Sequence, residues 1–330
     1  MASFDVFKGD GFTLSSLTAA INVGPHVPTL IGDSGLFSEE GVTTTTVQIE
    51  KQGSKLILVP SQERGGNGVV INADKRELIP FNTVHLPERA TILADEVQGL
   101  RAFGSETEAE SVENYVNTRF AKMRKNLEVT LEYHRIGAIQ GKVLDADGST
   151  ELVDLYAKFG LSKKTKSLVL GTAGTDVLSK VIEAVEMLEE SLGAEMYSGL
   201  TSYCSTGFFK KLVGHPKVKE AYDRWQNGAA LRDDMRKGFV FGDVTFKVYR
   251  GKVNGVDFIT ADKAYLVPEG IQDMFMTNFA PADYMETVNT MGLPFYANQE
   301  LLPMNKGVAL EAQSNPLCIN TRPDCVIELS

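Results

Sequence analysis

The fold is decided by the stretch "SETEAESVENYVNTRFAKMRKNLEVTLEYHRIGAIQG", residues 105–141, because it predicts one long amphipathic helix. Apolar or long side chains recur in it every three or four residues, which is the period of one helix face. They are Val112, Val116, Phe120, Met123, Leu127, Leu131, His134 and Ala138. Ser105 begins a capping box and Gly141 is a natural stop. At ~1.5 Å per residue the helix would be about 50 Å long, which indicates a structural strut.

The residues before this helix predict extended structure. Residues 1–40 mix Gly, Pro and scattered apolar side chains without a clear period, so we expect an irregular extended arm. "VTTTTVQIE", residues 42–50, is rich in β-branched residues and predicts a strand. Further strands are expected at 55–60, at 68–71 and in "ELIPFNTVHLP". The polar, Gly-rich piece "SQERGGNG" between them favours the tip of a long hairpin.

The residues after the helix predict a compact mixture of helices and strands, so we assign the chain to the α+β class. A hairpin is expected to turn at Asp147-Gly148. Residues 166–193 indicate a strand, a turn and a helix, and "EMYSGLTSYCS" indicates another strand. Two short helices are expected around His215-Pro216, and an antiparallel pair is expected around Asn254-Gly255. Two short strands are expected in 307–329.

Composition excludes several classes of protein. The chain has 330 residues, 43% of them hydrophobic and 23% charged, which is typical of a globular protein. No apolar run approaches the ~18–20 residues of a membrane span, and the N-terminus carries no signal peptide. We therefore expect a cytoplasmic protein without a membrane partner. Three cysteines without a zinc-type spacing predict neither a disulfide framework nor a metal site. The net charge of −10, without a basic stripe, argues against specific nucleic-acid binding.

The letters Gly32-Asp33-Ser34-Gly35 are similar to the stretch that carries the nucleophile of trypsin-like proteases. A serine protease needs a histidine base and an acid within reach of the serine. Only His26 precedes Ser34, and the preceding strands of a protease barrel do not fit into about 30 residues. We therefore predict a turn in which Asp33 and Ser34 accept backbone hydrogen bonds, and no catalytic residue.

"LVLGTAGTD", residues 168–176, is the better candidate for an enzyme site. Its Gly171 and Gly174 have the spacing G-x-x-G, whereas a dinucleotide fingerprint needs G-x-G-x-x-G. A P-loop needs Gly-Lys-Ser/Thr at the helix start, where this chain has Thr175 and Asp176. We predict that Thr175 is a helix N-cap and that the protein binds no cofactor. A nucleotide-using enzyme and an ordinary soluble oligomer remain as the alternative classes.

The order of these segments resembles a tailed-phage major capsid protein. The letters are similar to the family of the lambda head protein, major capsid protein E, over nearly the whole chain. The matching stretches, in order, are "GLFSEEGVTTTTVQIE" (35–50), "HLPERATILADEVQG" (85–99), "VLDADGSTELVD" (143–154), "CSTGFFKKLVGHPKVKEAY" (204–222), "FGDVTFKVYRGKV" (241–253), "ADYMETVNTMGLPFYA" (282–297) and "LEAQSNPLCINTRPDCVIEL" (310–329).

The resemblance implies the tailed-phage major capsid fold, divided into four parts. They are an N-terminal arm (1–40), an extended loop or E-loop (41–84), a peripheral or P-domain (85–155 and 300–330) with the spine helix 105–141, and an axial or A-domain (156–299). It also implies a non-enzyme without a cofactor, whose copies assemble into hexamers and pentamers of an icosahedral shell. The chain begins directly in the arm, so no fused scaffolding segment is expected.

The same resemblance implies the partners and the location of the protein. Its main partner would be itself, with a decoration protein, a scaffold and a portal as further partners. The shell would enclose double-stranded DNA without specific binding, and an acidic chain suits this because it does not hold DNA to the wall. The protein would be assembled in the cytoplasm of the host bacterium and reside in the virion capsid.

Contacts between subunits are expected at the loop tip and on the outer face of the long helix. The candidates are Arg64, Gly65, Gly66, Asn67, Glu106, Glu110, Arg119 and Arg124. The apolar stripe of the helix is expected to pack on a sheet formed partly by C-terminal strands. Arg124 is expected to point outward, away from that sheet.

Overall fold

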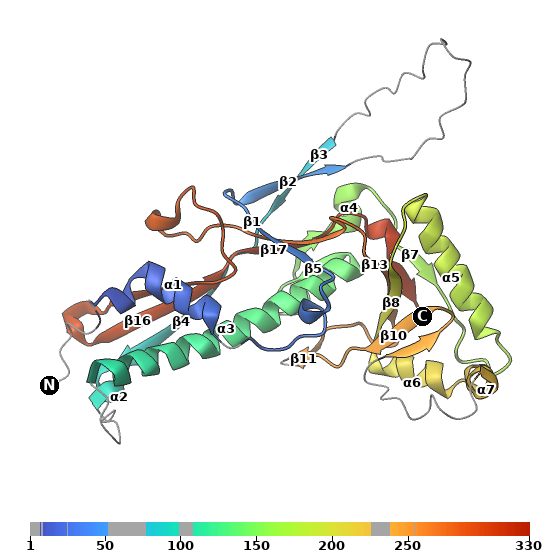
Figure 1. Ribbon diagram of the computed structural model, residues 1–330, viewed down its shortest axis with the longest axis horizontal. Coiled ribbons are helices and arrows are strands. Elements are labelled where there is room, and N and C mark those ends of the chain that lie inside the picture. Colours follow the sequence, from blue (N-terminus) through green and yellow to red (C-terminus); the bar gives the residue numbers. More distant parts are fainter. Residues whose placement is uncertain are drawn as a thin grey trace, which may run out of the picture. The chain divides into compact units, whose positions relative to one another are not determined.

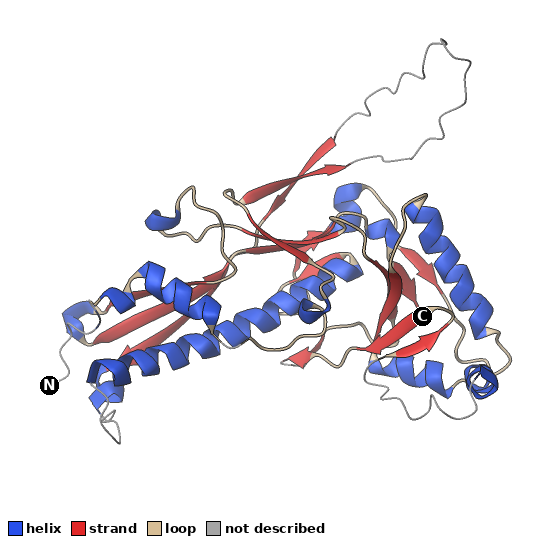
Figure 2. Ribbon diagram, in the orientation of Figure 1, coloured by secondary structure: helices blue, strands red, loops and turns tan. Residues whose placement is uncertain are grey.

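The computed structural model describes residues 7, 9–24, 26–51, 77–98, 108–225, 238–253 and 255–330. The described chain is built of both helices and sheets, as the α+β assignment predicts (Figures 1 and 2). It divides into two compact units, each assembled from segments that are far apart in the sequence. The first unit is Met1–Val47, Phe81–His134 and Met276–Cys318, and the second is Gln48–Pro80, Arg135–Phe275 and Ile319–Ser330.

The long helix predicted from the sequence is α3, Glu108–Gln140, with 33 residues. Residues 105–107, including the predicted N-cap Ser105, lie outside the described residues. Its apolar stripe is confirmed, because the side chains at 116, 120, 123, 127 and 131 are all buried. The short helix α2, Ala94–Gln98, precedes it.

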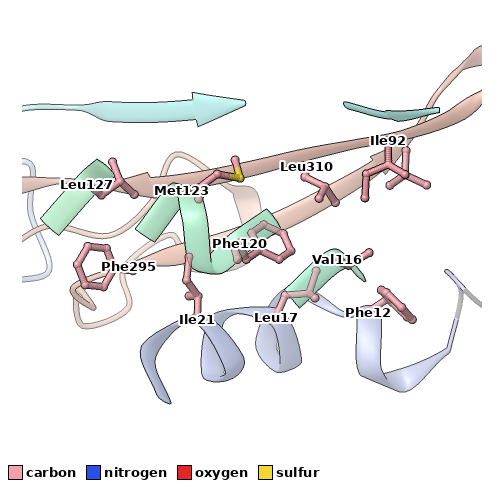
Figure 3. Packing of buried hydrophobic residues seen from close by; sticks show 13 residues of the cluster. Phe12, Leu17, Ile21, Ile92, Val116, Phe120, Met123, Leu127, Phe295 and Leu310 are labelled. Atoms are coloured by element: carbon pink, nitrogen blue, oxygen red, sulfur yellow. The ribbon is translucent and has the colours of Figure 1, made fainter. Parts of the chain in front are cut away.

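The core of the first unit lies between α3 and a three-stranded antiparallel sheet. The sheet has the order β15-β16-β4, with β4 at Leu86–Leu93, β15 at Tyr296–Leu301 and β16 at Gly307–Ser314. Phe120 and Met123 of the helix pack there with Leu310 of β16 (Figure 3). The predicted packing of the helix stripe on C-terminal strands is therefore confirmed.

The N-terminal segment is not wholly irregular, and this expectation was wrong. Helix α1, Leu14–Val23, buries Leu17 and Ile21 in the same core (Figure 3). Thr13 caps the helix by accepting a hydrogen bond from the Ser16 amide at 3.3 Å. The helix has only 10 residues, too few for the apolar period to stand out in the sequence.

A second sheet of three strands has the order β1-β14-β17. Its strands are β1 Ser38–Gly41, β14 Phe275–Phe279 and β17 Pro316–Asn320. The single strand expected at 42–50 was wrong, because β1 ends at Gly41 and β2, Thr46–Lys51, begins four residues after Val42. Strand β2 pairs with β3, Glu77–Asn82, and these two strands are the first and last segments of the predicted hairpin. The strands expected at 55–60 and 68–71 and the hairpin tip lie outside the described residues.

The second unit is organised around a six-stranded mixed sheet of order β7-β18-β13-β8-β10-β9. Its strands are β7 Lys164–Lys166, β8 Gly199–Cys204, β9 Phe239–Phe241, β10 Val244–Val248, β13 Ala264–Glu269 and β18 Ile327–Leu329. The central strands β8 and β13 are almost continuously buried, as is typical of strands covered on both faces. Residues 307–329 thus contribute three strands, β16, β17 and β18, where two were expected.

Helices and two small hairpins complete the second unit. The helices are α4 Leu155–Phe159, α5 Val177–Leu192, α6 Thr206–Gly214 and α7 Pro216–Trp225. The hairpins are β5 Lys142–Leu144 with β6 Glu151–Asp154, and β11 Lys252–Val253 with β12 Val256–Asp257. The predicted turn at Asp147-Gly148 and the predicted helix pair around His215 are confirmed.

The segment before α5 differs from the prediction in two ways. The strand ends at Lys166, and Val169 has a φ of +51°, a left-handed conformation that does not continue a β-ladder. The N-cap of α5 is Asp176, whose side chain accepts a hydrogen bond from the Ser179 amide at 3.3 Å. Thr175 instead donates to the Val169 carbonyl, so the cap was predicted one residue too early.

Candidate functional site

The Gly-Asp-Ser-Gly stretch forms a turn, as the sequence predicts. Residues Gly32–Ser34 make one turn of 3-10 helix, followed by Gly35 at a φ of +69°. Ser34 Oγ donates to the Ile31 carbonyl at 2.6 Å and accepts from the Leu36 amide at 3.2 Å. Asp33 Oδ2 accepts from the Thr29 amide at 3.1 Å. The serine and the aspartate therefore stabilise the backbone of the turn.

The ring of His26 lies between two carboxylates. Its Nε2 is 2.9 Å from Asp33 Oδ1, and its Nδ1 is 3.1 Å from Glu128 Oε1 on helix α3. These two hydrogen bonds raise the pKa of His26, the contact with Glu128 contributing most. A serine nucleophile needs a ring nitrogen that accepts its proton. Both ring nitrogens of His26 are engaged by acids instead.

Glu128 belongs to a charged stripe on α3 that binds the N-terminal segment. Arg124, Glu128 and Glu132 are spaced four residues apart, so they share one face of the helix. They are only 7%, 5% and 2% exposed. We call these three residues the helix clamp. Arg124 Nε donates to Glu128 Oε1 at 2.8 Å, so the clamp contains its own ion pair.

The arginine of the helix clamp binds the end of α1. Its Nη1 donates to the carbonyl of Ile21 at 2.6 Å and to that of Gly24 at 2.7 Å. The last carbonyls of a helix have no partner within the helix, and the helix dipole favours a cation there. The guanidinium also lies 5.3 Å from the centre of the Phe295 ring.

The two glutamates bind amide groups further along the same segment. Glu128 Oε2 accepts from the Val27 amide at 2.9 Å. Glu132 accepts from the amides of Ile31 and Gly32 at 2.8 and 3.1 Å. Buried charges are tolerated when hydrogen bonds satisfy them, and here the backbone of residues 21–32 supplies the partners. The helix clamp therefore fixes the path of the N-terminal segment along α3.

The predicted contact residues are distributed differently from what the sequence indicated. Arg124 does not point outward, because its guanidinium is buried in the helix clamp; that expectation was wrong. Arg119 is half-exposed and bonds Glu96 Oε2 at 2.6 Å and the Tyr115 hydroxyl at 2.7 Å. The Tyr115 hydroxyl and Arg119 hold the pKa of Glu96 below its ordinary value. The other candidates lie outside the described residues: Arg64, Gly65, Gly66, Asn67, Glu106 and the side chain of Glu110.

The glycine loop before α5 lines an open hollow of about 370 Å³. Gly174, Asp176, Lys217 and Glu220 contribute to its wall. Lys217 Nζ is already bound to Glu220 at 3.0 Å. Asp176 at the start of α5 and Glu220 of α7 both line the hollow, and these two carboxylates disfavour a phosphate group, which needs positive charge and free amide groups.

A metal site, a reactive thiol and a membrane span each require particular features of the described residues. The described part of the chain holds no group of three or more His, Cys, Asp or Glu side chains that could bind a metal. Cys204, Cys318 and Cys325 are buried and form no disulfide. Burial raises the pKa of the Cys204 thiol to about 12, so it is protonated at neutral pH. Among the described residues, no helix combines the length and apolar character of a membrane span.

The loop that joins β14 to β15 exposes several large apolar side chains. We call residues 280–294 the apolar loop. Its exposed apolar residues are Met285, Val288, Met291 and Leu293. Hydrogen bonds within the loop and to a neighbouring segment fix its shape. Thr287 Oγ1 donates to the Ala282 carbonyl at 2.7 Å within the loop, and the Gly292 amide donates to the carbonyl of Val42, outside the loop, at 2.9 Å. Gly292 is required because a Cβ there would overlap the Phe279 carbonyl. An ordered loop with outward apolar residues is typical of a protein interaction surface.

Comparison with known proteins gives one consistent family. The model of the family "Phage major capsid protein E" matches residues 13–330. The chain is 26% identical to the major capsid protein of Pseudomonas phage KPP10, over 97% of each chain. It is also 26% identical to the major capsid protein of Salmonella phage Felix O1, over 96% of each chain.

Solved structures agree on the fold. The putative capsid protein of a prophage of E. coli CFT073 superposes with a TM-score of 0.55 at 13% identity, over 96% of this chain and 98% of that one. The capsid of cyanophage P-SCSP1u gives a TM-score of 0.50 at 13% identity, over 93% of this chain and 90% of that chain. The resemblance in fold expected from the sequence is confirmed.

Proposed function

The chain belongs to the phage major capsid protein E family, and we propose that its copies form the hexamers and pentamers of an icosahedral shell. It is a major capsid protein of a tailed phage. The observation that carries this conclusion is the family match over residues 13–330 together with the capsid fold of the whole described chain. Shell assembly is the function that such a fold and family support best.

The apolar loop supports a role in contacts between copies. Met285 is 90% exposed although the loop around it is held by internal hydrogen bonds. A preformed loop loses little conformational entropy on binding, so burial of its apolar side chains contributes directly to association. Many weak contacts of this kind suit a shell, because each one is correctable while their sum is stable.

We extend the proposal to the division of the chain into parts. Residues 1–40 would be the arm, 41–84 the extended loop, and 156–299 the axial domain, with the peripheral domain formed by 85–155 and 300–330. The paired strands β2 and β3 within 41–84 support the extended loop, and the long helix α3 within 85–155 supports the spine of the peripheral domain.

We infer a structural rather than a catalytic role, since Ser34 and His26 are both engaged in backbone and carboxylate contacts. The net charge of −10 supports enclosure of DNA without specific binding. Contacts with a decoration protein, a scaffold and a portal, and assembly in the host cytoplasm, are proposed from the family alone.

Electron microscopy and sedimentation of the purified full chain test shell assembly. Closed shells built of hexamers and pentamers are expected. A single small species at every salt and protein concentration would support the ordinary soluble oligomer instead. Melting that rises on addition of ATP or NAD would favour the nucleotide-using enzyme, because a ligand that binds the native state stabilises it.

Met285→Glu tests the apolar loop, with Met196→Glu as the matched control. Met196 is 88% exposed, so both substitutions place a charge at an exposed methionine. Each is expected to leave subunit stability within about 0.5 kcal/mol of the original chain. Met285→Glu should reduce the yield of shells, and Met196→Glu should not. Equal yields for the two variants would remove the apolar loop from the contact, without affecting the family assignment.

A further inference from the structure

We propose that His26 is a proton-controlled latch, which ties the turn at Gly32–Ser34 to helix α3 when its ring carries two protons. The inference concerns contacts within one chain and goes beyond shell assembly. It assigns a role to His26, the histidine that precedes Ser34 in the sequence.

The geometry of the ring carries the proposal. Nε2 faces a carboxylate oxygen of Asp33 at 2.9 Å, and Nδ1 faces a carboxylate oxygen of Glu128 at 3.1 Å. A neutral imidazole has one N–H, so it donates to only one of these acids and turns a lone pair toward the other. Only the imidazolium donates to both. Both hydrogen bonds of the ring therefore form together only when His26 is protonated.

The charges around the ring come from both elements that face it. Asp33 belongs to the turn, and its other oxygen binds the Thr29 amide. Glu128 belongs to α3, and its Oε1 also accepts from Arg124 Nε at 2.8 Å. Glu132, one helical turn further on, binds the Ile31 and Gly32 amides. Partial burial opposes protonation of His26, whereas the two carboxylates favour it.

The direction of the pH effect follows from these contacts. Hydrogen bonds to Glu128 and Asp33 raise the pKa of His26 above its ordinary value of 6.5. A raised pKa in the folded state means that the latch contributes stability fully below pH 6.5 and loses it as the pH rises through the higher folded value. Residues 26–35 would then be held more loosely, while the carboxylate contacts of the helix clamp to the backbone remain.

Two measurements on the full chain, kept as unassembled subunits, test the latch. Ring-labelled histidine NMR gives the pKa of His26, since the chain has only four histidines and single substitutions assign them. Hydrogen exchange of residues 26–35, corrected for the intrinsic pH dependence of exchange, reports how firmly the segment is held. Protection is expected to fall roughly two- to fivefold between pH 6 and pH 9, the range that exposed ion pairs give.

Substitutions separate the latch from general effects of pH. His26→Gln should abolish the pH dependence of protection in residues 26–35. Asp33→Asn should lower the pKa of His26, because the amide oxygen still serves the Thr29 amide but the charge is gone. His85→Gln is the matched control, because the ring of His85 is also half-exposed and binds Asn315 Oδ1 at 2.7 Å. This substitution should leave the pH dependence of protection in residues 26–35 unchanged.

The latch is overturned by any of three results. The first is a His26 pKa at or below that of free histidine. The second is equal corrected protection at pH 6 and pH 9. The third is the same pH dependence in His26→Gln as in the original chain.

Discussion

Arg124→Ala is the sharpest test of the helix clamp. Sequence reasoning places Arg124 on the outer face of α3, where truncation costs almost nothing. The structure buries its guanidinium among two backbone carbonyls, one carboxylate and the Phe295 ring. The buried placement predicts a much larger loss of unfolding free energy on truncation of Arg124 than the exposed placement does.

The expected loss follows from the buried ion pair. The side chains of Arg124 and Glu128 are 9% and 5% exposed. Removal of one partner of such a pair typically costs about 3–5 kcal/mol, because the remaining charge is left buried. Glu128 keeps its bonds to the Val27 amide and to His26, so we expect the lower half of that range, about 3 kcal/mol.

Arg119→Ala is the matched control, five residues earlier on the same helix. The substitution is chemically identical, and alanine has the same helix propensity at both positions. Arg119 pairs with Glu96, but both side chains are more than one third exposed. We therefore expect a loss of about 0–1 kcal/mol.

Urea unfolding of the unassembled full chain, followed by far-UV circular dichroism, measures both losses with a common m value. A double-mutant cycle with Glu128→Gln then isolates the coupling of the pair, expected at about 0.5–3 kcal/mol. Arg124→Lys should recover only part of the loss, because an ammonium cannot serve three acceptors in the planar arrangement that a guanidinium allows. Equal losses for Arg124→Ala and Arg119→Ala would refute the helix clamp.

Three further predictions concern the core, a tight turn and a thiol. Phe120→Ala should lower the free energy of unfolding in urea by roughly 3–5 kcal/mol, because the ring is buried between α3 and the sheet. The control Val23→Ala, at an exposed position, should lower it by less than about 0.5 kcal/mol. Gly292→Ala should lower the free energy of unfolding by at least about 1–3 kcal/mol, because a Cβ would overlap a neighbouring carbonyl. Gly171→Ala should be close to neutral, because a Cβ at Gly171 would meet open space. Equal effects of the two substitutions would contradict the close approach at Gly292. Cys204 should resist iodoacetamide at pH 8 in the folded chain and react on unfolding, because burial raises its pKa to about 12; rapid labelling of native protein would show that the site opens.

The parts of the fold that could be predicted are those with a local period. The stripe through Val116, Phe120 and Leu127 repeats over many turns, so its length and its buried face followed from spacing alone. Helix α1 has the same kind of stripe, Leu17 and Ile21, but only over 10 residues, and the prediction missed it. Val169 was expected in the strand that precedes α5, yet its φ of +51° is a left-handed conformation that a strand does not contain.

The helix clamp could not be predicted from local sequence. Charged residues on a helix are usually assigned to the solvent, since burial of a charge is costly without a partner. The partners here are backbone groups of residues 21–32, about one hundred positions away along the chain. One signal was present: Arg124, Glu128 and Glu132 keep a strict spacing of four, which indicates a second stripe beside the apolar one.

These two stripes leave a narrow outward face on α3. The apolar stripe packs on the sheet and the helix clamp binds the N-terminal segment, so two adjacent sides of the helix are buried. The exposed positions between residues 118 and 126 are Thr118, Lys122, Lys125 and Asn126. Charge reversal at Arg124 would therefore disrupt the subunit itself before any contact between subunits. On this part of α3, Lys122 and Lys125 are the basic residues whose reversal changes an outward charge while the packing of the helix is kept.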